Sequence, residues 1–146
     1  MLEKFRTIFN SLSVKGRNPV ALFAIMKMDD LEDKWTVIYA DESSSSSEQE
    51  KNLIFSFILN EMKKILSAEE LNQIARISVF TTKEHLVRSL LSFQTGARIS
   101  NQKVNGNFVH EGYIIKGSED SNQGNKMSLP TDNDGDNKSK AIKGGN

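Results

Sequence analysis

Four acidic side chains that stand close together in the sequence are the first candidates for chemistry. They are Asp29, Asp30, Glu32 and Asp33. Carboxylate oxygens are the ligands that Mg²⁺ and Ca²⁺ prefer, so this cluster could serve a small metal-dependent hydrolase. The same cluster separates two apolar runs, 20–28 and 35–40, and a charged turn keeps the tip of a strand pair in solvent. We favour the solvated turn and keep the metal site as the alternative.

Two histidines could supply the base or the nitrogen ligand that such a hydrolase needs. His85 falls in the first turn of a predicted helix, and His110 falls in a predicted strand, where alternation directs Glu111 to the other face. The chain contains no Gly-x-Ser-x-Gly, Walker A or His-Glu-x-x-His motif. The sequence therefore leans away from an enzyme and identifies no catalytic residue and no cofactor.

A second alternative is a single-strand nucleic-acid binder that uses one face of a sheet. The residues for it would be Arg76, Arg98, Phe108 and Tyr113. Aromatic side chains on a sheet can stack bases while basic side chains hold phosphates. However, nineteen Lys and Arg balance nineteen Asp and Glu, so no net positive charge attracts a polyanion. A nucleic-acid partner is therefore disfavoured.

The cysteine count and the length of the apolar runs bear on where the protein acts. The chain has no cysteine, which excludes disulfides and thiolate chemistry and fits a reducing compartment, so we predict a cytoplasmic protein. The longest apolar run, 20–26, is far shorter than the about 18 residues that span a bilayer. We therefore predict no membrane partner.

Hydrophobic periodicity predicts the order of the elements. Helices are expected over 2–12, from 47 to about 66, over a short stretch after 67, and after 81. Three capping boxes are predicted to begin the last three of them: Ser47–Glu50, Ser67–Glu70 and Thr81–Glu84. Gly96 is predicted to end the last helix. Strands are expected over 20–28, 35–40, 76–80, 98–104 and 108–116, the last two joined by an Asn105-Gly106 turn.

This order, α-β-β-α-α-β-α-β-β, predicts an α+β fold with one mixed sheet of about five strands. Three to four helices should pack mainly on one face, and the helical link between the strands at 35–40 and 76–80 should make those two strands parallel. The expected domains are an amphipathic helix and linker at 1–19, a single domain at 20–117, and a polar, disordered tail at 118–146.

Two apolar surfaces remain to be covered in this arrangement. Adjacent residues of the last strand point to opposite faces, so Tyr113 and Ile115 need a cover that the N-terminal helix could provide, in its own chain or in a neighbouring one. The sequence thus favours a non-enzymatic protein-interaction module, or a regulatory or assembly module, that self-associates. The predicted contact residues are Phe5, Ile8, Phe9, Tyr113 and Ile115.

Overall fold

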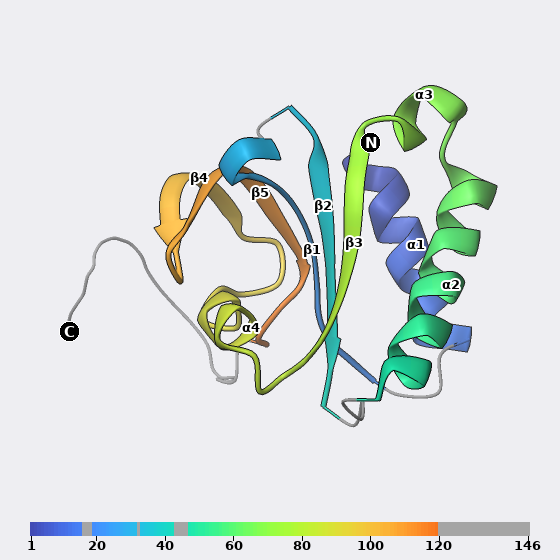
Figure 1. The fold of residues 1–146 in the computed structure, drawn as a ribbon, viewed down its shortest axis with the longest axis horizontal. Helices are drawn as coiled ribbons and strands as arrows, with labels where there is room; N and C mark the ends of the chain where they lie inside the picture. Colours follow the sequence, from blue (N-terminus) through green and yellow to red (C-terminus); the bar gives the residue numbers. More distant parts are fainter. Residues whose placement is uncertain (16–18, 32, 43–46, 120–146) are drawn as a thin grey trace.

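The computed structural model describes residues 1–15, 19–31, 33–42 and 47–119. It contains one five-stranded mixed sheet with the strand order β3-β2-β1-β5-β4 (Figure 1). In chain order the elements are α1 (Leu2–Lys15), β1 (Val20–Met28), the 3-10 turn η1 (Asp29–Leu31), β2 (Trp35–Asp41), α2 (Glu48–Ile65), α3 (Ala68–Leu71), β3 (Ile74–Thr81), α4 (His85–Leu90), β4 (Arg98–Val104) and β5 (Asn107–Lys116). The predicted fold class and element order are confirmed.

The predicted strand pairings are also present. β1 and β2 form an antiparallel hairpin across the acidic turn, and β2 and β3 are parallel with α2 as their crossover. β4 and β5 form the second hairpin, in which Asn105 and Gly106 have φ angles of 50° and 80°. Those positive φ angles are what a two-residue type I′ turn requires, and asparagine and glycine adopt them most readily.

Both faces of the sheet are covered, because α1, α2 and α3 lie on one face and α4 lies on the other (Figure 1). Side chains of β1 alternate between two cores: Phe23 and Ile25 pack in the core beneath α1 and α2, whereas Leu22 and Met26 pack in the core beneath α4 and the β4–β5 hairpin. A central strand that is buried on both sides has to be almost continuously apolar. This explains the uninterrupted hydrophobic run of β1.

Two of the three predicted capping boxes begin helices. The Ser47 hydroxyl accepts a hydrogen bond from the Glu50 N–H at 3.2 Å, and Ser67 and Glu70 bond reciprocally. The third prediction is wrong, because Thr81 pairs with Asp41 as the last residue of β3 and α4 begins only at His85. Helix α4 also ends before the predicted glycine stop. No helix in the described part of the chain is long and apolar enough to cross a membrane.

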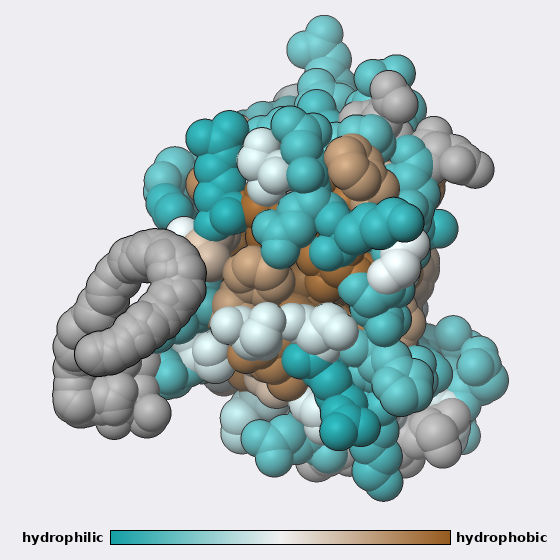
Figure 2. Space-filling model, turned by 90° about the vertical axis from the view of Figure 1, so that its left-hand side faces the viewer, coloured by the Kyte–Doolittle hydropathy of each residue, from teal (hydrophilic) through white to brown (hydrophobic). Residues whose placement is uncertain are grey.

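Figure 2 shows the side of the molecule that carries α4 and β4. Hydrophobic side chains are visible at the centre of this side, surrounded by polar ones. The core on the α4 side of the sheet has five half-buried outer members: Phe80, Leu86, Leu91, Phe93 and Ala97. The chain continues beyond β5 along this side, where Ser118 pairs with Gln94. The rest of the predicted tail, apart from Glu119, lies outside the described residues.

Candidate functional site

The acidic turn is held by hydrogen bonds to β5. The Asp29 carboxylate accepts a hydrogen bond from the Phe108 N–H at 2.9 Å, and the Asp29 carbonyl oxygen lies 3.2 Å from His110 Nε2. These contacts fix Asp29 at a φ angle of 51°. Among the described side chains, no three of His, Asp or Glu lie close enough to hold a metal ion. Glu32 and the side chain of Asp30 lie outside that description, and Asp33 is exposed.

The candidate nucleic-acid residues are divided between the two halves of the sheet. Arg76 is on β3, where its Nε donates a hydrogen bond to the Thr36 hydroxyl at 3.2 Å, whereas the other three are on β4 and β5. There the Arg98 guanidinium lies 5.7 Å from the Tyr113 ring, and Phe108 packs edge-on against His110 at 4.7 Å. The four residues therefore form no single platform for stacked bases.

The five residues predicted to form an interaction site lie together in the core beneath α1. Phe5 and Ile8 are fully buried, Ile115 is almost so, and Phe9 stacks on Phe23. Tyr113 packs at the edge of the same core. Helix α1 thus covers the sheet of its own chain, which was one of the two arrangements that the sequence left open. A surface that is free to meet a partner has to be sought elsewhere.

Two buried acidic groups that sequence reasoning did not single out are held by neighbouring side chains. The Tyr39 hydroxyl donates to Asp41 at 2.7 Å, and burial together with this carboxylate raises the pKa of Tyr39 above the range of an ordinary tyrosine. Glu61 lies between Lys64 at 3.1 Å and Lys15 at 3.7 Å, and the hydrogen bond from Lys64 lowers the pKa of its carboxyl. Glu61 thus links α1 to α2, whereas the bond between Tyr39 and Asp41 lies within β2, and both contacts have a structural role.

The open edge of β3 is a candidate binding feature of the described chain. β3 is at the end of the sheet and pairs with β2 alone among the described strands. An unpaired edge presents a row of N–H and C=O groups that can bind another extended chain. The sequence of β3, Ile-Ala-Arg-Ile-Ser-Val-Phe-Thr, has one charge and no proline. Its one charge, Arg76, and its irregular pairing at Ala75 are the protective devices that it has, and both lie in its first half, so the stretch 77–81 carries none of them.

The opposite edge of the sheet, β4, does carry such devices. It contains two basic residues, Arg98 and Lys103, and its middle residue Asn101 has a φ angle of 49°. Charged side chains and an irregular backbone both hinder pairing with another strand. The two edges thus differ in the property that matters for strand addition, and β3 is the edge that remains competent.

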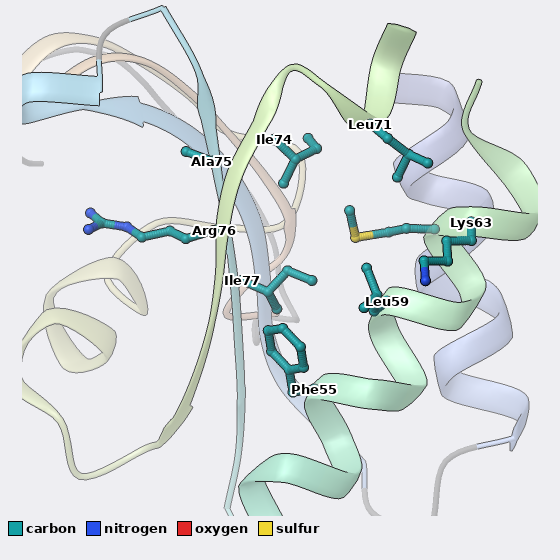
Figure 3. A pocket seen from close by; sticks show the side chains of 9 residues that line it. Phe55, Leu59, Lys63, Leu71, Ile74, Ala75, Arg76 and Ile77 are labelled. Carbon is teal, nitrogen blue, oxygen red and sulfur yellow. The ribbon is translucent and has the colours of Figure 1, made fainter. Parts of the chain in front are cut away.

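An apolar groove runs beside β3 and has a volume of about 440 Å³. Figure 3 shows that Ile74 and Ile77 of β3 point across it towards α2, from which Phe55 and Leu59 point back, and that Leu71 lies at its end. A shift of register at Ala75 allows Ile74 and Ile77, three residues apart, to face the same side. Arg76 points to the other side of β3 in the same view.

Phe55 gives this groove an exposed apolar side chain. It is 39% exposed, and the other large hydrophobic residues with comparable or greater exposure in the described chain are Val14 and Leu53. Phe55 stands four and seven residues before Leu59 and Met62, so helical spacing places all three on the side of α2 that lines the groove. That spacing was the signal in the sequence by which the helix side of the groove could have been found.

No protein-family model, curated protein or solved structure matches this chain. Function is therefore inferred from the geometry of the β3 edge and of the groove beside it.

Proposed function

We propose that this protein is a non-enzymatic interaction and assembly module that binds an extended protein segment along the open edge of β3. The observation that carries the proposal is the combination of an unpaired edge strand with an apolar groove that exposes Phe55. Backbone groups of the edge would supply affinity and the groove would accept alternate apolar side chains, as in β-strand addition. The partner is a protein or a second copy of the chain, and no cofactor takes part.

The location that fits this role is the cytoplasm, because the chain contains no cysteine that a disulfide could use.

The size of the groove also suits the role. It accommodates a few side chains along one strand, and its lining is apolar apart from Lys63 and Arg76, whose side chain points away from the groove. A short extended segment with large apolar residues at every second position meets these requirements.

Selection from a displayed library of random peptides tests this proposal. The wild-type protein is immobilised sparsely, so that neighbouring copies do not occupy the groove. We expect enriched peptides with apolar residues at alternate positions and no proline between them. Phe55→Lys should abolish their binding, whereas Leu53→Lys, a change on the same helix outside the groove, should leave it intact. Failure to enrich any such peptide, or equal binding by both variants, would overturn the proposal.

A further inference from the structure

Only a few registers allow β3 to pair with a second copy of itself. From Arg76 to Thr81 each residue of β3 has a partner on β2. Along a strand, alternate residues direct their N–H and C=O groups to one neighbouring strand and the residues between them to the other. When two copies of β3 pair in antiparallel fashion, residues whose N–H and C=O groups point to the open edge must lie opposite residues of the same kind. A twofold axis therefore passes through a residue that faces its own copy.

Side-chain chemistry excludes three of the four central residues as the position of this axis. An axis at Arg76 would oppose two guanidinium groups, and like charges directly opposite each other destabilise a strand pair. An axis at Ile77 would place Ala75, where the backbone is irregular, opposite Val79 and would leave only 76–78 as a regularly paired stretch. An axis at Val79 would oppose the apolar Ile77 to the polar Thr81.

An axis at Ser78 pairs complementary side chains along the regular part of both strands. Ile77 then faces Val79 of the second copy, and these residues belong to the groove side of the sheet. Arg76 faces Phe80 of the second copy on the other side, where a guanidinium beside an aromatic ring is attractive. Ser78 faces its own copy, which places two small polar groups at the centre.

Helix α2 fits the same axis. A twofold axis perpendicular to the joined sheet puts both α2 helices on one face, side by side and antiparallel. The first turn of α2 carries Glu48 and Glu50 and its last turn carries Lys63 and Lys64, so antiparallel neighbours bring opposite charges together. Phe55 lies near the middle of α2 and next to Ile77, close to the position of the axis (Figure 3). The two phenylalanines can therefore close both grooves.

We propose that the segment bound by the β3 edge is β3 of a second copy, paired antiparallel about a twofold axis at Ser78. The resulting homodimer joins two five-stranded sheets into one continuous sheet. This inference rests on the docking role proposed above and adds the identity of the partner and the register.

Disulfide trapping tests the register, because the chain has no cysteine of its own. Directly opposite residues of antiparallel strands have Cα atoms about 4.5 or 5.5 Å apart, within the about 4.4–6.8 Å that a disulfide spans. Under mild oxidation Ser78→Cys should form a covalent dimer. The matched control is Gln102→Cys on the opposite edge, β4. Ser78→Cys should react roughly a hundredfold faster, because thiols held in a complex react at a millimolar effective concentration.

The mass of the wild-type protein, measured by sedimentation velocity over a dilution series, provides the second readout. Twice the chain mass at high concentration together with selective trapping of Ser78→Cys supports the inference. Equal rates for the two cysteine variants would overturn the register, and a wild type that stays monomeric would overturn the dimer. The two proposals can fail separately: a monomer that still selects peptides through Phe55 keeps the docking site, whereas a monomer that selects none loses both.

Discussion

Truncation of Phe55 to alanine should weaken dimerisation about a thousandfold. Phe55 is 39% exposed in the single chain, and for a side chain of roughly 200 Å² this exposes about 80 Å². Burial of that area at about 25 cal/mol per Å² contributes about 2 kcal/mol in each copy, hence about 4 kcal/mol in a twofold dimer. A factor of ten in the dissociation constant corresponds to about 1.4 kcal/mol.

Sedimentation velocity over a dilution series of each variant measures this change in the dissociation constant. The matched control is Leu53→Ala, since Leu53 is 58% exposed on the same helix but does not line the groove. A surface change of this kind alters free energies by no more than about 0.5 kcal/mol, or about twofold in the dissociation constant. Equal weakening by both changes, or none by Phe55→Ala, would refute the reasoning.

Part of the Phe55 ring packs within its own chain, so the variant also loses some fold stability. Urea unfolding at a concentration where the protein is monomeric measures that loss on its own. The dissociation constant is then compared under conditions in which both variants are folded. This separation ensures that an unfolded variant is not mistaken for one that has lost its partner.

Three further predictions concern the stability of the fold. A hydrogen bond from Lys4 at 2.7 Å and one from the Ser67 N–H lower the pKa of Glu70 from 4.5 to about 2. The stabilising contribution of the Glu70 carboxylate is complete above pH 4.5 and is lost as the pH falls towards 2. The difference in unfolding free energy between wild type and Glu70→Gln, measured by urea unfolding, should therefore close over this pH window, and a difference that does not depend on pH would contradict the contact. Ile8→Ala should cost about 2–5 kcal/mol of unfolding free energy because Ile8 is fully buried between α1 and the sheet. A loss below about 1 kcal/mol would show that α1 is not part of the core. Gly106→Ala should lower the unfolding free energy by about 1 kcal/mol through its φ of 80° alone. Gly117→Ala should lower it more, because the added Cβ would stand 2.6 Å from the Phe93 carbonyl oxygen. A larger loss for Gly106→Ala than for Gly117→Ala in chemical denaturation would count against both explanations.

The order of elements was predictable because its signals are local. The Asn105-Gly106 turn has the two residues that accept positive φ, and the Ser67–Glu70 capping box begins α3 as the sequence indicates. Thr81 shows the limit of such signals. It satisfies the spacing of a capping box, but its pairing with Asp41 in the ladder keeps it in β3, so a contact distant in sequence determined where α4 begins.

The candidate site was not predictable in the same way, since it depends on which surfaces remain uncovered. Phe5 and Ile8 form an apolar stripe that could cover either their own sheet or a neighbour's, and only the packing of α1 shows which. The groove requires the position of α2 over β3 and the register shift at Ala75. Neither is encoded in the periodicity of a single element.

Hydrogen exchange of the β3 amides, resolved residue by residue and repeated at increasing protein concentration, tests the docking edge most directly. In the isolated chain, the β3 amides that point towards β2 are protected by hydrogen bonds, and those that point towards the open edge exchange quickly. We expect the fast amides between Arg76 and Phe80 to become protected as the concentration rises, while the amides of β4 do not change. Exchange in β3 that is independent of concentration, or protection that develops on β4 instead, would contradict it.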